Sequence, residues 1–364
     1  MVSLSSDRLV SRSSALRRAA LASCASALLL TGVASLQPAA ARTAAAPITL
    51  TGAGSTFVFP FFNKAFFVYS KAHPDVRVNY QPIGSGGGIQ QFTKKTVDFG
   101  ASDVPMNPTE LKAAEAAGGP VLQFPVALGA EAIVYNLPSV NGYVKISRAV
   151  LAGIYLGKIT SWDDAALAKD NAELKLPKLP IAVVHRSDGS GTTYIFTDYL
   201  STVSADWKSA VGTGKSVQWP AGVGGKGNAG VAAQVRNTPG AIGYVELAYA
   251  IQNKMAHAQV QSRGGSFVYP TLATTRNAAA TLPNVDATHF SIVNATGAQS
   301  YPIVGYSWAL VYQKPRDAAR SKALVQVMTW VVSEGQKYAG DLQYVPLPAS
   351  IQKAAQQTIA KVGV

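Results

Sequence analysis

Short apolar segments with strand character alternate with segments of helical periodicity along most of the chain. Between residues 57 and 72 the apolar positions recur at helical spacing, whereas residues 76–80 alternate as a half-buried strand does. The same reasoning predicts helices at 89–95, 148–155, 163–169, 192–200 and 318–338, and strands at 48–50, 97–101, 121–128, 132–135, 181–184 and 241–245. Alternation of this kind predicts an α/β fold, in which helices cover a sheet.

One helix start is predicted residue by residue. Asn107 is a favoured N-cap, Pro108 follows it at the first helical position, and Glu110 lies in the first turn. We therefore expect a helix to begin at Pro108.

The first 41 residues have the pattern of a secretory signal peptide. Four arginines precede a small-residue apolar stretch at 19–36, and Ala39-Ala40-Ala41 offers a cleavage site. Polar residues and glycine interrupt the stretch, which disfavours the alternative of a membrane anchor. We expect a cleaved leader at 1–41 and a mature protein in the periplasm.

Composition narrows the chemistry further. The chain has 364 residues, 48% of them hydrophobic, which is enough for two domains. Its single cysteine, Cys24, lies in the predicted leader, and its four histidines show no metal-ligand spacing. The sequence therefore predicts no disulfide, no metal and no cofactor.

The net charge is +13, and about +10 remains after residue 41. A basic surface suits an anionic ligand, a nucleic acid or an anionic membrane. Nucleic acid is disfavoured because no run of lysine and arginine is interleaved with aromatic residues.

Three glycine-containing turns, at 52–57, 83–88 and 186–192, each lie between a predicted strand and a predicted helix. Free N–H groups at a helix N-terminus, together with hydroxyls, favour an anion. Three alternatives stay open: Thr56 caps its own helix, the second turn is a flexible loop, or the third is a capped helix beside a surface ion pair.

Three charged residues sharpen the anion hypothesis. Arg186 offers a planar fork that matches an oxyanion, and Asp188 can hold that fork in place. Asp103 follows a buried apolar run, and a carboxylate beside an anion is favourable only when the anion carries a proton to donate. Phosphate keeps a proton near neutral pH and sulfate does not, although Asp103 as a turn or cap residue remains the alternative.

At these residues the chain resembles the periplasmic high-affinity phosphate-binding proteins that serve phosphate ABC importers. The resemblance runs from about Leu50 to Leu347. It is carried by segments 50–57, 79–87, 96–103, 154–159, 186–192, 224–228 and 239–246. It departs at Gly86, where some relatives have serine, and it is poor over 261–301.

The resemblance implies a role for each candidate residue. Arg186 gives a charged contact that Asp188 orients, and Asp103 accepts the phosphate proton. The implied hydrogen-bond donors to phosphate are Ser55, Thr56, Phe57, Ser85, Ser190, Gly191 and Thr192.

The resemblance also implies a two-lobed clamshell with the ligand in its cleft. Residues 42–126 and 300–364 would form lobe I, and residues 127–299 lobe II. The expected partners are inorganic phosphate and the membrane permease of an ABC importer with its ATPase, and the protein is expected to be a monomer before it docks.

Enzyme motifs are incomplete. Residues 213–216 resemble the end of a P-loop but lack its first glycine, and His185 with Ser190 only superficially suggests a hydrolase. We therefore predict a binding protein rather than an enzyme. A sensor or a secreted phosphatase-like protein of the same fold is the alternative, as is another tetrahedral anion such as sulfate or arsenate.

Overall fold

The computed structural model describes residues 46–315 and 317–363, and the statements below concern these residues. The predicted signal peptide at 1–41 lies outside them. The strands are β1 (Ile48–Gly54), β2 (Val76–Pro82), β3 (Phe99–Ser102), β4 (Val121–Tyr135), β5 (Lys145–Ile146), β6 (Ala182–Arg186), β7 (Val223–Gly225), β8 (Ala241–Glu246), β9 (Ala256–His257), β10 (Gln259–Gln261), β11 (Phe267–Val268) and β12 (Val304–Tyr312).

The helices alternate with these strands over most of the chain. They are α1 (Phe59–Ala72), α2 (Ser85–Thr93), α3 (Pro108–Gly118), α4 (Arg148–Tyr155), α5 (Ala165–Asp170), α6 (Gly191–Val203), α7 (Ala205–Ala210), α8 (Gly227–Asn237), α9 (Leu247–Gln252), α10 (Leu272–Ala280), α11 (Ala318–Val331) and α12 (Ala349–Ile359), with 3-10 segments η1 (Glu334–Tyr338) and η2 (Gly340–Leu342). The predicted α/β fold is confirmed.

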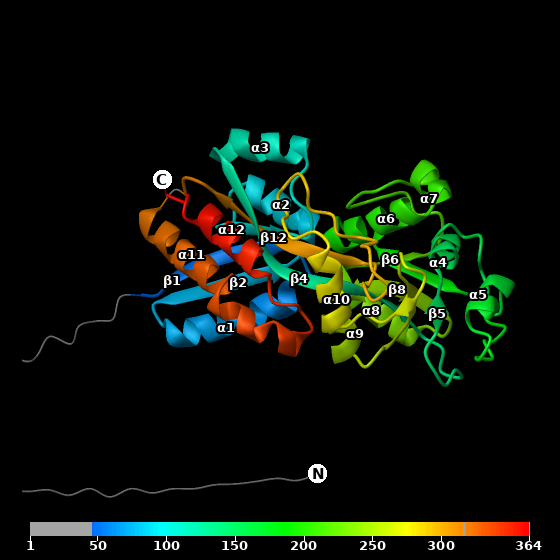
Figure 1. The fold of residues 1–364 in the computed structure, drawn as a ribbon. Helices are drawn as coiled ribbons and strands as arrows, with labels where there is room; N and C mark the ends of the chain where they lie inside the picture. Colours follow the sequence, from blue (N-terminus) through cyan, green and yellow to red (C-terminus); the bar gives the residue numbers. More distant parts are fainter. Residues whose placement is uncertain (1–45, 316, 364) are drawn as a thin grey trace, which may run out of the picture. The chain divides into compact units, whose positions relative to one another are not determined.

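Strands β4 and β12 join two groups of strands into one mixed sheet. The first group is β2, β1 and β3, and the second is β8, β6 and β7. The strand order is β2-β1-β3-β12-β4-β8-β6-β7, with β9 beside β4. Strand β4 pairs with β12 along residues 121–130 and with β8 along 131–135, in both cases antiparallel. Figure 1 shows β4 and β12 running together between the two groups. Because β4 lies between the two groups, it fixes how their strand ends face each other.

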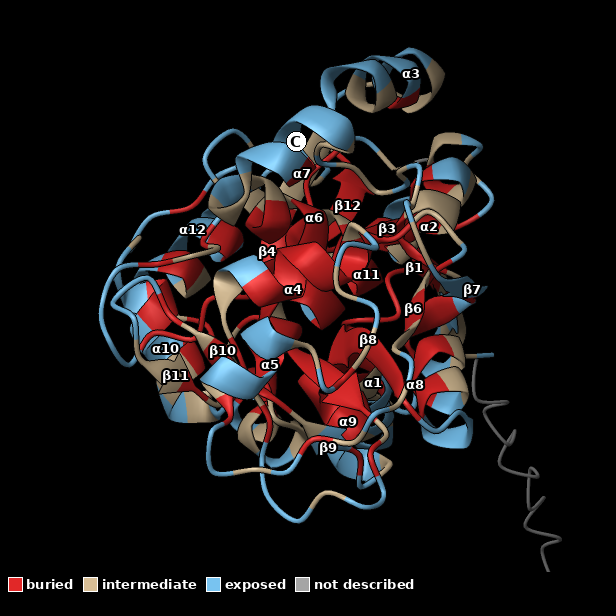
Figure 2. Cartoon of the chain, turned by 90° about the vertical axis from the view of Figure 1, so that its right-hand side faces the viewer, coloured by how far each residue is buried: buried red, intermediate tan, exposed pale blue. Residues whose placement is uncertain are grey.

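Helices cover both faces of each group. In the first group, α1 and α11 pack on the face that carries Leu50, and α2 packs on the face that carries Ala53. In the second group, α4 and α6 lie on one face and α8 lies on the other. Strand β8 and helix α4 are mostly buried, as their colour in Figure 2 shows. Strands that are covered on both faces have mostly apolar sequences, and the sequences of β8 and β12 have this character.

Several sequence predictions are confirmed and three are wrong in detail. The predicted start of α3 is confirmed, because the Asn107 side chain accepts from the Glu110 N–H and the Glu110 side chain accepts from the Asn107 N–H. Residues 121–128 and 132–135 are one strand, since the backbone pairing continues through Gly129 and Ala130. The predicted helix at 318–338 ends at Val331, and after a turn at 332–333 the segment η1 begins at Glu334.

The third error concerns the second glycine turn, which is not a flexible loop. Helix α2 begins at Ser85, four residues earlier than predicted, so the glycines form its first turn. A side chain at Gly88 would overlap the backbone of Ala53 and Gly54. Glycine is therefore required where this helix approaches the end of β1.

Within the described residues, none of the helices has the length and hydropathy needed to cross a membrane. The same residues contain no group of three or more histidine, cysteine, aspartate or glutamate side chains that could hold a metal ion.

The buried Gln336 attaches the C-terminal part of the chain to β4, and its loss should be costly. Its amide nitrogen donates to the carbonyls of Val126 and Val331 at 3.0 and 2.8 Å, and its amide oxygen accepts from the Leu347 N–H at 2.8 Å. Gln336→Ala leaves three buried backbone groups unpaired, so we expect the free energy of unfolding to fall by about 2–4 kcal/mol. Urea unfolding measures this, with the exposed Gln356→Ala in α12 as the control. Equal stability of the two variants would contradict the assignment.

Candidate functional site

The candidate site forms where strands of the two groups end. Strand β1 ends at Gly54 and β3 at Ser102, while β6 ends at Arg186 and β8 at Glu246. Parallel strands of an α/β sheet place their carboxyl ends at one edge, where ligands of such folds bind. The turns that follow these strands carry the predicted site residues, so the sheet brings together loops that are far apart in the sequence.

Asp103, which is 3% exposed, lies at the centre of a set of hydroxyls. Ser55 and Ser307 both donate to its Oδ1, the latter at 2.6 Å, and Ser85 donates to Oδ2 at 3.4 Å. Burial raises the pKa of Asp103 to about 6, although these hydroxyls and the charge of Arg186 act in the opposite direction. Asp103 therefore stays mostly ionised at neutral pH and acts as a hydrogen-bond acceptor.

Arg186 is 4% exposed and is held on one side by Asp188. Its Nε and Nη2 donate to the two carboxylate oxygens at 2.8 and 2.6 Å, and its Nη1 donates to Thr192 Oγ1 at 3.1 Å. Burial acts to raise the pKa of Asp188, but the hydrogen bonds and charge of Arg186 outweigh it and keep that pKa below its usual value. The predicted orienting role of Asp188 has this geometric basis, because a bidentate pair fixes the guanidinium plane.

Asn228 and Thr56 connect the first turn to the second strand group. Asn228 Nδ2 donates to Thr56 Oγ1 at 2.8 Å and to Thr192 Oγ1 at 3.2 Å, and its Oδ1 accepts from the Glu246 N–H at 2.8 Å. Thr56 does not cap α1, whose N-cap is Val58, so that alternative is wrong. The Tyr249 hydroxyl donates to the Thr56 carbonyl at 2.7 Å.

The second and third turns meet directly. The Gly191 N–H donates to Ser85 Oγ at 3.0 Å, and the Gly86 N–H donates to the Gly189 carbonyl at 2.8 Å. A side chain on Gly191 would overlap Asp103, so glycine is required at this position. The third turn does cap its helix, since Ser190 is the N-cap of α6, but its ion pair is not at the surface, because Arg186 is 4% exposed.

Several helix N-termini point their partial positive charge at this centre. Ser85 begins α2, Gly191 begins α6 and Gly227 begins α8. Each of these residues contacts a predicted site residue. Ser85 contacts Asp103 and Gly191 contacts Ser85, as described above, and the Gly227 N–H donates to Asp188 Oδ1 at 2.9 Å. Helix N-termini favour an anion. The centre thus combines N–H groups, hydroxyls and one guanidinium around the buried carboxylate of Asp103, while the second carboxylate, Asp188, pairs with the guanidinium.

Nearly all the predicted site residues meet at this centre. Ser55, Thr56, Ser85, Asp103, Arg186, Asp188, Gly191 and Thr192 are connected by the contacts above, and Ser190 is the N-cap of α6. Phe57 is fully buried beside them, and its N–H donates to Ser55 Oγ at 2.9 Å.

Sequence reasoning missed three polar contributors, Asn228, Ser307 and Tyr249. Only Asn228 had a signal, because it follows the glycine-rich segment 224–227.

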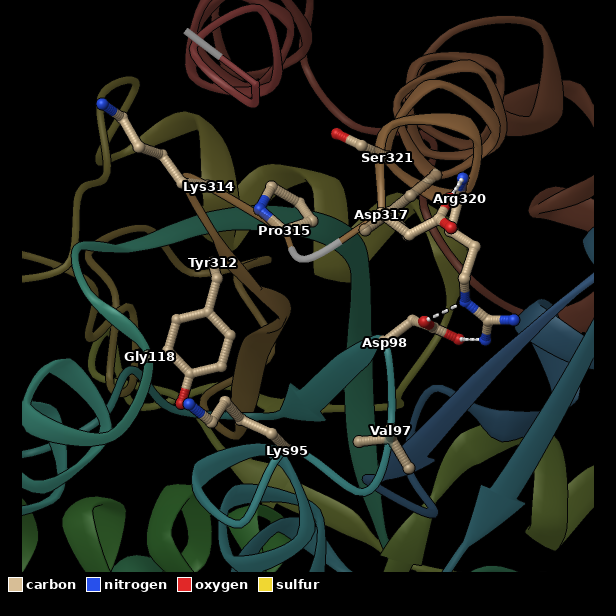
Figure 3. Close-up of a pocket in the computed structure, with 11 residues that line it drawn as sticks. Lys95, Val97, Asp98, Gly118, Tyr312, Lys314, Pro315, Asp317, Arg320 and Ser321 are labelled. Atoms are coloured by element: carbon tan, nitrogen blue, oxygen red, sulfur yellow. Dashed lines mark hydrogen bonds and ion pairs between the residues drawn. The ribbon is translucent and has the colours of Figure 1, made fainter.

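Of two pockets in the described residues, one lies beside the centre and the other lies elsewhere. One, of about 280 Å³, lies beside it and is lined in part by Thr56, Asp188 and the exposed Lys226. The other, of about 250 Å³, is drawn in Figure 3; the Arg320 guanidinium there pairs with the Asp98 carboxylate. Its lining includes none of the predicted site residues, so we do not assign the anion to it.

The fold is α/β, and polar groups of a kind that suits an anion gather at its strand ends. Residues 39–335 match the family model of the PBP superfamily domain. The chain is 45% identical over 309 residues to the phosphate-binding protein PstS of Xylella fastidiosa, covering 84% of this chain and 83% of that protein. It is also 45% identical over 311 residues to PstS of Pasteurella multocida, covering 85% and 89%. The chain belongs to the PstS family within the PBP superfamily.

Solved structures show the likeness in fold. A high affinity periplasmic phosphate-binding protein bound with phosphate superposes with a TM-score of 0.68 at 21% identity, covering 85% of this chain and 93% of that one. A phosphate binding protein from Stenotrophomonas maltophilia gives a TM-score of 0.65 at 18% identity, with the same coverage.

The raised pKa of Asp103 has a consequence for the stability of ligand-free protein. Between about pH 4 and pH 6 the folded state holds a proton that the unfolded state has released, so stability should fall by up to about 3 kcal/mol as pH rises through this range. Asp103→Asn should not show this fall, because its amide oxygen still accepts and nothing ionises. Urea unfolding against pH measures the difference. The exposed Asp341→Asn should follow wild type, and parallel curves for wild type and Asp103→Asn would contradict the assignment.

Proposed function

We propose that this protein captures inorganic phosphate in the centre around Asp103 and delivers it to the membrane permease of an ABC importer. The observation that carries the proposal is the combination of many donors with one buried, ionised acceptor. Such a set suits an oxyanion that keeps one proton, since the proton has a partner and the charged oxygens have donors. The relatives named as phosphate-binding proteins support the same ligand.

Each predicted site residue has a role in the proposed complex. Asp103 accepts the phosphate proton, and Arg186 gives the charged contact in the orientation that Asp188 sets. The donors are the residues of the three turns, Ser55, Thr56, Phe57, Ser85, Ser190, Gly191 and Thr192. Sulfate would face Asp103 without a proton, so the carboxylate would repel it and stay unpaired.

The two strand groups correspond to the proposed lobes. Lobe I takes residues 42–126 and 300–364, and lobe II takes residues 127–299, with the boundaries inside β4 and just before β12. The contacts of Ser85 with Gly191 and of Thr56 with Asn228 then span the two lobes. The proposed motion is a hinge on the crossing strands that closes these contacts around phosphate and excludes water.

The contacts of His185 argue against the alternative of a secreted phosphatase. Among the described residues His185 contacts the Arg186 carbonyl and stacks on Trp219, while Ser190 Oγ accepts from the Thr193 N–H. Ser190 Oγ thus has no hydrogen bond to a base among these residues, and a serine nucleophile needs one. Assay of a phosphomonoester tests this, and turnover would favour the enzyme.

The proposed location is the periplasm, reached by cleavage of the leader at 1–41. The partners are then the permease and its ATPase, and the protein is a monomer before it docks. A fold-matched relative described as periplasmic supports the location. If the protein serves transport, deletion of its gene should abolish high-affinity phosphate uptake. If it is a sensor, that uptake should remain.

Selectivity tests the ligand and the role of Asp103 together. We expect phosphate to bind one-to-one and sulfate to give no heat in calorimetric titration of protein freed of bound anion. Asp103→Asn should reduce the ratio of phosphate to sulfate affinity by about 10- to 100-fold, because its amide no longer rejects an unprotonated anion. Asp341→Asn should keep the wild-type ratio. Wild type that binds no phosphate would refute the function, and an unchanged ratio in Asp103→Asn would refute the role of that residue.

An ion pair between Lys215 and Glu110 joins the proposed lobes and should slow release. The pair is partly buried, and the Lys215 carbonyl also accepts from the Ser190 N–H at 2.8 Å. Lys215→Met should raise the phosphate dissociation rate about three- to tenfold, as expected for a partly buried pair, with little change in the association rate. Stopped-flow competition measures both rates. The exposed Lys208→Met is the control for lost charge. Equal phosphate dissociation rates for wild type and Lys215→Met would contradict the proposed role of this ion pair.

A further inference from the structure

Two glutamates lie fully buried behind the anion centre. Glu131 on β4 and Glu246 at the end of β8 are directly opposite in the antiparallel ladder, and both are 0% exposed. Directly opposite residues place their side chains on the same face of the sheet, with Cβ atoms about 5 Å apart. Their carboxyl groups are therefore within reach of each other in the core.

Three of the four carboxyl oxygens have no hydrogen-bond partner among the described residues. They are both oxygens of Glu131 and Oε1 of Glu246; the remaining oxygen accepts from the Ala248 N–H at 2.9 Å. The nearby guanidinium of Arg186 is already engaged by Asp188 and Thr192. Two unpaired buried carboxylates side by side would be very unfavourable, whereas a proton on one lets it donate to the other.

The electrostatic surroundings lead to the same conclusion. Burial raises the pKa of both glutamates well above the usual range, and the charge of Asp103 adds to the effect on each. The charge of Arg186 near Glu131, and the Ala248 N–H and the Tyr344 hydroxyl near Glu246, act in the opposite direction without reversing it. The titratable and charged groups that face the pair are Asp103, Arg186, Tyr155, Tyr244, Tyr249, Tyr301 and Tyr344. Burial raises the pKa of each of these tyrosines, so the tyrosines stay neutral and the charges near the pair belong to the anion centre itself.

We infer that Glu131 and Glu246 form a buried proton-binding pair, which retains at least one proton at neutral pH and takes up more when an anion binds at the Asp103 centre. The linkage part rests on the proposed function. A bound anion makes ionisation of the pair harder, so the pair binds protons more tightly in the complex. By reciprocity, anion affinity falls as pH rises through the range in which the free pair loses its proton.

The first arm of the test needs no ligand. Infrared spectra of anion-free wild type at about pH 8, above the range in which Asp103 titrates, should show a protonated carboxyl band that shifts in heavy water. The band should weaken in Glu131→Gln and in Glu246→Gln and vanish in the double variant. The exposed Glu115→Gln in α3 should keep it. A wild type without the band, or a folded double variant that keeps it, overturns the pair. Even if no variant folds, a wild-type spectrum without the band is enough to overturn the pair, and one single variant that folds is enough to assign a band to it.

The second arm measures linkage. Calorimetry with inorganic phosphate at about pH 9, in two buffers of different ionisation heat, counts protons taken up on binding. Wild type should take up as much as one proton more than the double variant, and its affinity should fall as much as about tenfold more per pH unit. Equal proton uptake overturns the linkage. If wild type binds no phosphate, the proposed function fails, and the infrared arm still decides whether the pair holds a proton.

Discussion

The burial of Asp103 is the constraint on which the site depends. An ionised carboxylate leaves water only where other groups replace its hydration, and here the replacements come from three separate elements. Ser55 follows β1, Ser85 begins α2 and Ser307 lies on β12, so all three elements must be in place before the carboxylate is satisfied. The close approach of α2 to β1 and the antiparallel pairing of β12 with β3 meet this requirement.

Much of the candidate site could be predicted because its signals are local. A glycine-flanked turn between a strand and a helix shows its chemistry within six or seven residues, as the turn at 186–192 does. The partners of those turns could not be predicted in the same way. Asn228 reaches Thr56 across 172 positions, and Ser307 reaches Asp103 across 204. Such contacts depend on the strand order of the whole sheet, and no periodicity in the sequence encodes that order.

The errors in element boundaries have the same origin. Glycine has a low intrinsic helix propensity, so residues 86–88 predicted a loop, yet packing against the end of β1 selects a helix with no side chains there. The strands predicted at 121–128 and 132–135 are one strand, and its pairing partner changes between Ala130 and Glu131 from β12 to β8. In both places tertiary contact outweighs local preference, and both places border the anion centre.

The charges of this centre suggest how an anion could be recognised without a large excess of positive side chains. Asp188 offsets much of the charge of Arg186, and Asp103 adds a negative charge, so net side-chain charge cannot supply the attraction. Three helix N-termini and a set of hydroxyls supply it instead, as oriented dipoles in a water-poor setting where each hydrogen bond is strengthened. Recognition by dipoles is sensitive to how many protons the ligand carries, because one misplaced acceptor is costly. The same exclusion of water keeps a proton on Glu131 or Glu246, so ligand selectivity and protein protonation follow from one physical cause.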